Sequence, residues 1–361
     1  MRVVHVVEAL AGGVTTYFKD LSNFFGAVEN SKGIETTIIY SDNRKEVDSE
    51  KVENEFSHGV DFVKINMVRE FSVVNDFIST LKLIKTLKKI KPDIVHLHSS
   101  KAGVVGRIAC FFVFNKKIKI YYTPHGYSFI RTDISSFSKK IYWFIEKNIQ
   151  FIFGGTTIAC GDTEYKIAKK IGKSILNRNG ISVNEINQYY NKPENDVLTI
   201  GIVARITNAR NPVLFNNIAL RYPHYNFIWI GDGELNYKLN APNIKITGWF
   251  MDTKSVLIEL NNIDIYLQTS LWEGLPIAVL EAMALKKPVI ATNVIGNKDA
   301  VLNNETGFLF NSIEELDNYF LFLSEEKNRI IFGEKALERC YAFFDKNKNF
   351  SSLSSIYING L

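Results

Sequence analysis

Short apolar runs rich in β-branched and aromatic residues alternate with stretches of helical length along most of this chain. In the first half, the runs that we predict as strands span residues 3–7, 36–40, 62–65, 94–98, 118–123 and 156–160. Segments between them, such as 75–90 and 135–153, have the length and the apolar spacing of helices. Continuous apolar strands that alternate with helices predict an α/β fold, in which helices cover both faces of a parallel sheet.

The alternation stops in a polar, asparagine-rich stretch at 177–196 and then starts again. Further strands are predicted at 198–204, 226–231, 244–247, 264–269, 288–293 and 307–310. A chain of 361 residues exceeds the usual size of one hydrophobic core. We therefore predict two Rossmann-like parallel-sheet domains, residues 1–180 and 181–361, that face an interdomain cleft. The last helix, at about 343–358, is expected to return to the N-terminal domain.

The composition excludes several classes of protein. Hydrophobic residues make up 46% of the chain and charged residues 22%, which is typical of a globular protein and not of a disordered one. No run of about 18 uncharged apolar residues occurs, so we predict no membrane span. The N-terminus lacks the small-residue cleavage pattern of a signal peptide. Cys110, Cys160 and Cys340 have no disulfide or metal spacing, and we expect them to be core thiols in a reducing cytoplasm.

Positive charge is concentrated in the first half of the chain. Residues 1–192 contain 28 Lys and Arg against 19 Asp and Glu, a net charge of +9, whereas the remainder carries −4, which together give the total of +5. Most of the excess lies in residues 101–192. A basic half of this kind predicts an anionic partner or surface, and a solvated basic face is the alternative.

Candidate ligand-binding residues follow the predicted strands, because ligands of open α/β sheets bind at the carboxyl ends of the strands. Gly12 and Gly13 lie where the chain turns from the first strand into a helix. A glycine turn there lets an anion approach free backbone N–H groups, although a plain strand-to-helix turn is the alternative. The G-x-G-x-x-G dinucleotide fingerprint is absent, which argues against an NAD-dependent oxidoreductase.

The first loop of the second array contains Arg205 and Arg210 before a helix that starts near Pro212. Two guanidinium groups that converge on a helix N-terminus suit a diphosphate, because each can chelate phosphate oxygens. Surface arginines paired with local acids are the alternative. Gly233 lies in a tight turn that can admit a nucleotide edge, and Trp249 offers an aromatic wall one strand later. Taken singly, each of these two segments is more often an ordinary turn.

The segment LWEGLPIAVLEAMA, residues 271–284, carries two carboxylates in an apolar stretch that should avoid unpaired charge. Glu273 precedes Pro276, a residue suited to the first turn of a helix, and Glu281 follows in that helix. In one continuous helix, a separation of eight residues would place the second carboxylate roughly 80° around the axis from the first. Both could then contact one long ligand at different depths. Two solvent-exposed acids are the alternative.

The two acids, with Gly-Leu-Pro after the first, resemble the signature of the large retaining glycosyltransferase family 4. Supporting motifs cover nearly the whole chain, at residues 12–13, 93–107, 123–126, 158–165, 177–180, 204–212 and 231–235. The glutamate block is highly specific, and the other motifs support it. SSKAGVVGR (99–107) and TPHGYSF (123–129) are similar to the branch that builds capsule, O-antigen and exopolysaccharide repeats. The resemblance implies the GT-B fold of two Rossmann-like domains.

The resemblance also implies roles for the acids and for the helix start. Glu281 would hydrogen-bond the ribose of the donor nucleotide, and Glu273 would contact hydroxyls of the donor sugar. The backbone around the sugar and the diphosphate would come from Gly274, Leu275, Pro276 and Ile277.

Cations and the N-terminal domain would complete the donor site. Arg205 and Arg210 would neutralise the diphosphate leaving group as the glycosidic bond breaks; family members commonly have lysine at the second position. Gly12 and Gly13 would close on the phosphates. His125 would sit beside the donor sugar and its anomeric carbon, with a purely structural histidine as the alternative. The resemblance implies retention of the anomeric configuration. No Asp-x-Asp metal motif occurs, so we expect transfer without a metal or another cofactor.

These roles define the expected partners. The donor would be a nucleotide sugar, with UDP favoured, that carries a hexose or an N-acetylhexosamine. The acceptor would be a polyprenyl-diphosphate-linked sugar or an oligosaccharide, and no nucleic acid is expected. Basic residues interleave with aromatic ones in 111–152, which suits docking on an anionic membrane, although aromatic residues of the core are the alternative. We expect a cytoplasmic protein at the inner face of the cytoplasmic membrane.

Two other functions remain open on the sequence. A nucleotide-sugar 2-epimerase of GT-B fold would bind the same donor without an acceptor, but it would need additional carboxylates and histidines for proton transfer. A non-catalytic sugar-nucleotide-binding subunit would have no need of both glutamates, both arginines and His125.

Overall fold

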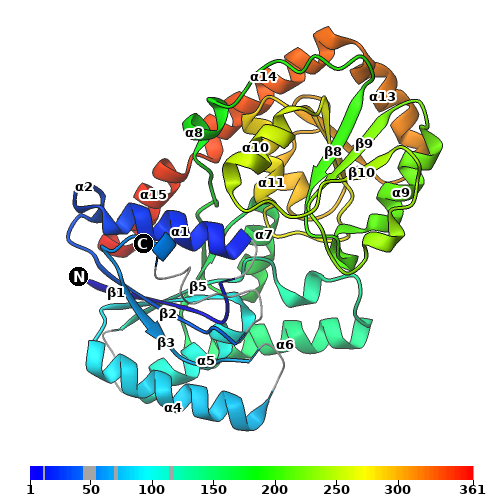
Figure 1. The fold of residues 1–361 in the computed structure, drawn as a ribbon. Helices are drawn as coiled ribbons and strands as arrows, with labels where there is room; N and C mark the ends of the chain where they lie inside the picture. Colours follow the sequence, from blue (N-terminus) through cyan, green and yellow to red (C-terminus); the bar gives the residue numbers. More distant parts are fainter. Residues whose placement is uncertain (11–12, 44–53, 69–71, 114–117, 361) are drawn as a thin grey trace. The chain divides into compact units, whose positions relative to one another are not determined.

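The computed structural model describes residues 1–10, 13–43, 54–68, 72–113 and 118–360. The chain divides into two compact units: unit 1 comprises Met1–Asn179 and Asn347–Leu361, and unit 2 comprises Gly180–Lys346. Each unit is built on one parallel sheet with helices packed against it (Figure 1). Among the described residues, no helix is both long enough and apolar enough to cross a membrane.

Unit 1 contains a seven-stranded sheet in the order β3-β2-β1-β4-β5-β6-β7. Its strands are β1 (Arg2–Val7), β2 (Glu35–Tyr40), β3 (Asp61–Lys64), β4 (Ile94–His98), β5 (Lys119–Thr123), β6 (Thr156–Ala159) and β7 (Ser174–Leu176). Its helices are α1 (Gly13–Gly26), α2 (Val28–Ser31), α4 (Val73–Ile90), α5 (Ser99–Phe112), α6 (Ser136–Phe153), α7 (Asp162–Ile171) and α15 (Lys346–Asn359), with a 3₁₀ turn η1 (Ser128–Ile130).

The period-two alternation of the strands divides the core of unit 1 into two layers. On β1, Val3 and Val7 pack into one cluster with residues of α1 and α15, whereas Val4 and Val6 pack into the other with residues of α4 and α5. Figure 1 shows α1 and α15 on one side of this sheet and α4 and α5 on the other. His5 shares the α1 side of the sheet with Val3 and Val7.

Unit 2 contains a six-stranded sheet in the order β10-β9-β8-β11-β12-β13. Its strands are β8 (Thr199–Val203), β9 (Asn226–Ile230), β10 (Ile244–Ile246), β11 (Ile265–Gln268), β12 (Val289–Thr292) and β13 (Gly307–Phe310). Its helices are α8 (Val183–Asn187), α9 (Pro212–Arg221), α10 (Thr253–Asn261), α11 (Ile277–Ala284), α12 (Asn297–Ala300), α13 (Leu316–Ser324) and α14 (Glu326–Phe343). Short 3₁₀ turns are η2 (Asn208–Arg210), η3 (Asn236–Lys238) and η4 (Ile313–Glu315).

Polar side chains start several of these helices. Ser72, Ser135, Asn211 and Asp252 are N-caps whose side chains accept a backbone N–H from the third residue that follows. Such caps satisfy one of the N–H groups that the first turn leaves without a partner. Pro212 then occupies the first turn of α9, where its missing N–H costs nothing.

The predicted α/β fold and its parallel strands are confirmed, and each predicted strand is found within two residues of its expected bounds. Strand β7, which spans three residues, was not predicted, whereas the equally short β10 was. The polar stretch at 177–196 was predicted as a linker, yet it contains helix α8. The three cysteines are buried and free, as expected of core thiols.

The strand orders locate where ligands should bind. In each sheet the order reverses beside the first strand, between β1 and β4 in unit 1 and between β8 and β11 in unit 2. Open α/β sheets bind ligands outside the carboxyl ends of the strands at such a switch point.

Candidate functional site

The loop after β8 is held against the carboxyl end of β11. The backbone N–H of Leu271 donates to the carbonyl of Ala209 at 2.8 Å, and the Thr269 hydroxyl donates to the carbonyl of Arg210 at 2.7 Å. These bonds bring the two loops at the switch point of unit 2 together. They place Arg210 beside Glu273, although the two residues are 63 positions apart in the chain.

Glu273 is the centre of a buried polar cluster. Its side chain is 7% exposed and forms an ion pair with the guanidinium group of Arg210. Its Oε1 atom, which contacts Arg210, also accepts hydrogen bonds from Gln268 Nε2 at 2.8 Å and from Ser270 Oγ at 2.7 Å. A buried carboxylate requires partners of this kind, since an unpaired charge in the interior is costly.

The two predicted arginines do not have the same partner in the structure. Arg210 is 32% exposed and bonds to Glu273, whereas Arg205 is 44% exposed and lies 3.5 Å from the Glu234 carboxylate. The alternative interpretation, arginines paired with nearby acids, therefore describes both side chains in the absence of a ligand. Arg205 and Glu234 are exposed enough for solvent to screen their attraction.

Helix α11 begins later than the sequence suggested. Pro276 is its N-cap, and the helix starts at Ile277, so Glu273 lies in the preceding loop while Glu281 lies within the helix. The prediction that the two acids are separated by roughly 80° around one helix is therefore wrong. Pro276 has no N–H to offer, so the donors available at this helix start are the amides of Gly274, Leu275 and Ile277.

Both acids nevertheless act on the same part of unit 2. Burial raises the pKa of the Tyr266 phenol, and the charges of Arg210, Glu273 and Glu281 also act on it. The Tyr266 hydroxyl donates to the Val203 carbonyl at 3.3 Å, which links β11 to β8 at the switch point. The predicted acids and Arg210 therefore all lie within electrostatic reach of Tyr266 on β11.

The remaining predicted residues of unit 2 lie on the neighbouring loops. A side chain at Gly233 would come within 2.4 Å of the Ile206 carbonyl, so the loop after β9 packs tightly against the loop that carries Arg205. Only glycine allows this approach. Trp249 follows the edge strand β10 and is 63% exposed, which leaves its ring free to cover a ligand.

In unit 1, the structure describes two of the three predicted residues. Gly12 lies outside the described residues, and Gly13 is the first residue of α1. His125 follows β5 and has a φ of 52°, a left-handed conformation that is unfavourable for a residue with a side chain. The next amide, that of Gly126, donates to Glu164 Oε1 at 2.8 Å and helps to hold this turn. Strain of this type tends to occur at functional sites.

Three buried histidines beside His125 were not predicted. His5, His96 and His98 are fully buried on the α1 side of the sheet. Burial lowers the pKa of His5 to about 3 and that of His125 to about 4, and it lowers the pKa values of His96 and His98 well below the ordinary value. The sequence does contain a signal: in VVHVV and IVHLH the histidines alternate with aliphatic residues, which places them on one face of a sheet.

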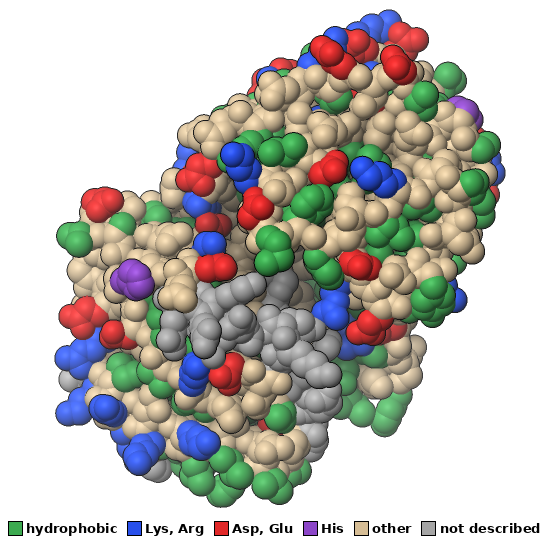
Figure 2. Space-filling view, viewed as in Figure 1, with side chains coloured by type: hydrophobic (Ala, Val, Ile, Leu, Met, Phe, Trp, Pro, Cys, Tyr) green, Lys and Arg blue, Asp and Glu red, His purple; other side chains and the backbone are tan. Residues whose placement is uncertain are grey.

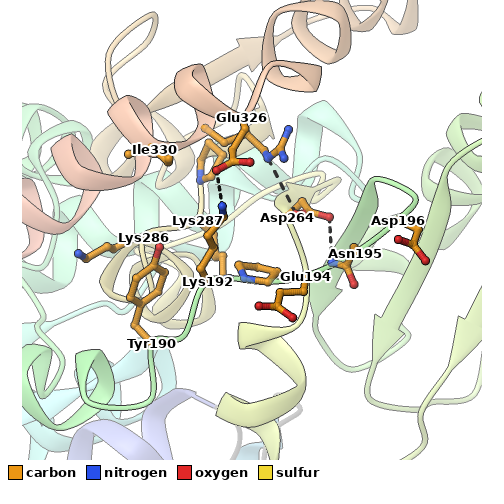
Figure 3. Close-up of a pocket in the computed structure, with 13 residues that line it drawn as sticks. Tyr190, Lys192, Glu194, Asn195, Asp196, Asp264, Lys286, Lys287, Glu326 and Ile330 are labelled. Atoms are coloured by element: carbon orange, nitrogen blue, oxygen red, sulfur yellow. Dashed lines mark hydrogen bonds and ion pairs between the residues drawn. The ribbon is translucent and has the colours of Figure 1, made fainter.

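A cavity of about 310 Å³ lies elsewhere in unit 2 (Figure 3). Asp264 and Lys287 line it, just before β11 and β12 begin, so it lies at the amino ends of the strands. Lys287 Nζ donates to the Asn261 carbonyl at 2.6 Å, and burial lowers the pKa of this lysine to about 7. Lys192 pairs there with Glu326 at 2.5 Å. This edge is opposite to the one where α/β sheets bind their ligands, so we do not assign the donor to it.

Helix α6 has an inverted distribution of side chains. Its only buried residues are Glu146 and Gln150, whereas Phe137 and Phe144 are 73% and 62% exposed. Tyr122 and Ser100 donate to the buried Glu146 carboxylate, at 2.9 and 3.2 Å. A surface helix of an ordinary soluble domain buries its apolar face instead.

Helix α4 adds an exposed apolar segment that the sequence analysis did not identify. The exposed apolar side chains of its first half are Val73, Val74, Phe77, Ile78 and Leu81. Lysines follow at positions 82, 85, 88 and 89. Figure 2 shows apolar and basic side chains close together on the part of the surface where α4 lies in Figure 1. Contiguous exposed apolar surface of this kind often marks an interaction site.

Two units of this type, each with a Rossmann-like strand order, define the GT-B class of proteins. A family profile described as "Glycosyltransferase Family 4" matches residues 11–174, and one described as "Glycosyl transferases group 1" matches residues 197–325. The chain belongs to glycosyltransferase family 4, and it is a glycosyltransferase.

Curated relatives and solved structures agree with this assignment. The chain is 29% identical to an Escherichia coli UDP-Gal:alpha-D-GlcNAc-diphosphoundecaprenol alpha-1,3-galactosyltransferase over 330 residues, which covers 81% of this chain and 82% of that protein. It is 27% identical to the Staphylococcus aureus capsular polysaccharide biosynthesis glycosyltransferase CapM, with 95% of both chains covered. The structure of Anabaena HepE in complex with UDP and glucose superposes with a TM-score of 0.79 over 100% of both chains at 16% identity. This last likeness concerns the fold.

Proposed function

We propose that this chain is a retaining glycosyltransferase of bacterial surface polysaccharide synthesis, which transfers a hexose or an N-acetylhexosamine from a UDP-linked donor. The observation that carries the proposal is the cluster around Glu273 at the carboxyl edge of the unit 2 sheet. A buried carboxylate held by neighbouring donors, a partly exposed arginine and backbone N–H groups beside a helix start suit a ligand with both hydroxyl groups and a diphosphate.

Residues of unit 2 are proposed to stabilise the diphosphate leaving group. Arg205 and Arg210 stabilise the negative charge that develops on the diphosphate as the bond to the sugar breaks. Gly274 and Leu275 donate backbone N–H groups at the start of α11, where the helix dipole favours an anion. No Asp-x-Asp metal motif takes part, and transfer should therefore persist in EDTA.

The two acids hold the neutral parts of the donor. Glu273 accepts hydroxyl groups of the sugar, and Glu281 accepts those of the ribose. When Arg210 turns from Glu273 to a phosphate, Gln268 and Ser270 still donate to the carboxylate. The carboxylate therefore remains satisfied, and little free energy opposes the exchange of partners.

Residues of unit 1 are assigned to the same substrate. His125 is proposed to contact the donor sugar, and Gly12 and Gly13 are proposed to contact the phosphates. Gly233 and Trp249 of unit 2 are proposed to contact the nucleotide. The strained backbone of His125 supports its assignment, because strain of this kind is retained where function requires it.

The first donor and acceptor to test follow from the relatives. The E. coli relative is named for UDP-galactose and for an N-acetylglucosamine linked to diphosphoundecaprenol. We therefore propose UDP-galactose as the first donor and a polyprenyl-diphosphate-linked sugar as the first acceptor. Oligosaccharide acceptors form the second set.

The exposed apolar side chains of α4 and of α6 are proposed to dock on an anionic membrane, where such an acceptor resides. Phe137 and Phe144 would enter the interface, and the neighbouring lysines 139, 140 and 147 would meet the lipid headgroups. Sedimentation with phosphatidylglycerol vesicles tests this proposal. Phe144→Ser should weaken binding, whereas Leu321→Ser, which changes an equally exposed apolar residue of unit 2, should not. Equal loss in both variants contradicts the assignment of the surface.

The transfer reaction is tested with purified protein, radiolabelled UDP-hexoses and a synthetic polyprenyl-diphosphate sugar. The proposal predicts a labelled lipid product whose new linkage has the anomeric configuration of the donor, as determined by NMR. An inverted linkage contradicts retention. Conversion of the donor to its epimer without an acceptor favours the 2-epimerase instead. Tight binding of the donor with no product in any condition favours a non-catalytic binding subunit.

A further inference from the structure

Three histidines of unit 1 form one continuous chain of hydrogen bonds. His5 Nδ1 lies 3.0 Å from His98 Nε2, and His98 Nδ1 lies 3.0 Å from His125 Nε2. The rings of His98 and His125 are inclined by only 20° with centroids 5.2 Å apart, so they meet nearly edge to edge, as an N–H···N bond requires. We call these three residues the histidine relay.

The direction of the bonds is set at the buried end of the relay. His5 Nε2 is buried and has no hydrogen-bond partner among the described residues. If that nitrogen carried a proton, an N–H group would be buried without an acceptor, which is rare and costly in proteins. The proton of His5 therefore resides on Nδ1, and it is donated to His98 Nε2.

The tautomers of His98 and His125 then follow from the tautomer of His5. His98 accepts at Nε2, so as a neutral ring it carries its proton on Nδ1 and donates it to His125 Nε2. His125 accepts at Nε2 in the same way, and its proton must be on Nδ1. Burial keeps the pKa values of all three rings below the ordinary value, so the rings are neutral near pH 7.

His96 lies beside the relay but does not belong to it. The Thr123 hydroxyl gives its proton to the Ile158 carbonyl at 3.0 Å, so it accepts from His96 Nε2 at 2.9 Å. The other nitrogen of His96 accepts from the hydroxyl of Tyr357 on α15. His96 thus has the opposite tautomer and serves as a brace between the sheet and α15.

The same bonds argue against a metal ion at this cluster. His5, His96 and His98 could each offer one nitrogen within 4.8 Å of the others. Both nitrogens of His96 and both nitrogens of His98 are already engaged in hydrogen bonds. A metal would have to break these bonds in a fully buried site.

We propose that His5 and His98 are positioning residues that fix His125 as a hydrogen-bond donor at Nδ1, so that His125 binds an oxygen of the donor substrate and does not act as a general base. The reverse direction would leave a bare Nδ1, which could abstract a proton. The choice between these roles is made by residues that do not touch the substrate. The identity of the bound oxygen, a sugar hydroxyl or a phosphate, rests on the proposed function, whereas the tautomer does not.

The tautomers can be measured on the unliganded protein. In protein labelled with ¹⁵N-histidine, long-range ¹H–¹⁵N correlation spectra at pH 7.5 distinguish a protonated ring nitrogen from a bare one. We expect His5, His98 and His125 to be protonated at Nδ1, and His96 at Nε2. The exposed His58 and His224 are assigned by single substitution to glutamine. Protonation of His125 at Nε2 would overturn the proposal.

Two substitutions of His5 separate positioning from simple packing. His5→Leu removes the first donor, whereas His5→Asn can keep an N–H group near the position of Nδ1. We expect His5→Leu to lower kcat about tenfold, the factor that one ordinary hydrogen bond controls, with little change in KM. His5→Asn should recover most of the loss. A wild-type kcat and an unchanged His125 tautomer in His5→Leu would also overturn the proposal.

A control variant and the two readouts keep the interpretations apart. His96→Gln changes an equally buried histidine outside the relay, so it should lower stability but leave His125 protonated at Nδ1. If no donor is transferred while the Nδ1 tautomers are observed, the proposed function fails and the relay stands. If transfer occurs while His125 is protonated at Nε2, the relay fails and the proposed function stands.

Discussion

Mild acidification should unfold unit 1 while unit 2 is still folded. His5, His96, His98 and His125 have folded pKa values below the 6.5 that each has in an unfolded chain, because burial disfavours the charged form. Below pH 6.5 the unfolded chain binds protons that folded unit 1 does not. The free energy of unfolding is therefore highest above pH 6.5 and falls as the pH falls toward the folded pKa values.

The size of the effect follows from His5, whose pKa is lowered to about 3. One pKa unit corresponds to about 1.4 kcal/mol, so at pH 5 this residue alone costs unit 1 about 2 kcal/mol. His125, whose pKa is lowered to about 4, costs a similar amount, and the burial of His96 and His98 acts in the same direction, so the total is a substantial part of the stability of a typical domain, about 5–15 kcal/mol. Unit 2 has only His224 among its described residues, and that side chain is exposed.

Pulse proteolysis with thermolysin in urea, at pH 7.5 and at pH 5.0, measures both units in one sample. Mass spectrometry assigns the surviving fragments to unit 1 or to unit 2. We expect the urea midpoint of unit 1 to fall much further than that of unit 2, and we expect His5→Asn to remove about 2 kcal/mol of the fall in the free energy of unfolding. Equal shifts of the two midpoints, or no dependence on pH in unit 1, would refute the reasoning from buried neutral histidines.

The remaining predictions concern unit 2. Glu281→Ala should weaken UDP binding about tenfold in calorimetric titrations, as expected for the loss of a charged hydrogen-bond acceptor, and unchanged affinity would remove this residue from the site. Arg205→Ala should mainly lower kcat, by about 10²-fold, with an unchanged melting temperature, and a pure KM effect would contradict a role in the transition state. Glu273→Gln should lower the stability of unit 2 by about 1–3 kcal/mol in urea unfolding, because it leaves Arg210 without its anionic partner. An unaltered urea midpoint would show that hydration of Arg210 replaces the lost ion pair. Lys287→Met should raise the stability of unit 2 by about 1–3 kcal/mol at pH 7. Burial lowers the pKa of this lysine to about 7, so protonating it in the folded protein costs free energy. A loss of stability would show that the hydrogen bond to Asn261 outweighs that cost.

The fold was predictable because apolar alternation is a local property of the chain. Each strand of four or more residues was found; of the two three-residue strands, β10 was found and β7 was not. The boundary of α11 was less predictable. Pro276 is compatible with both the N-cap and the first turn, and the choice between them moved Glu273 out of the helix.

The partners of the site residues depend on packing that one sequence does not contain. The alternating histidines of β1 and β4 are visible in the sequence, but the parallel register aligns His5 with His96 and not with His98, its hydrogen-bond partner. The inverted face of α6 is hidden for a related reason. Its helical spacing was predicted, whereas the burial of Glu146 depends on Tyr122 and Ser100 from other elements.

A nucleoside diphosphate sugar is proposed to bind at the carboxyl edge of the unit 2 sheet. Hydrogen–deuterium exchange with and without UDP-galactose tests it most directly, because the loops after β8 and β11 are covered by separate peptides. We expect slower exchange in residues 204–214 and 271–285 and no change around the cavity lined by Tyr190 and residues 192–196. Protection confined to that cavity, or saturating binding that leaves both loops unprotected, would contradict it.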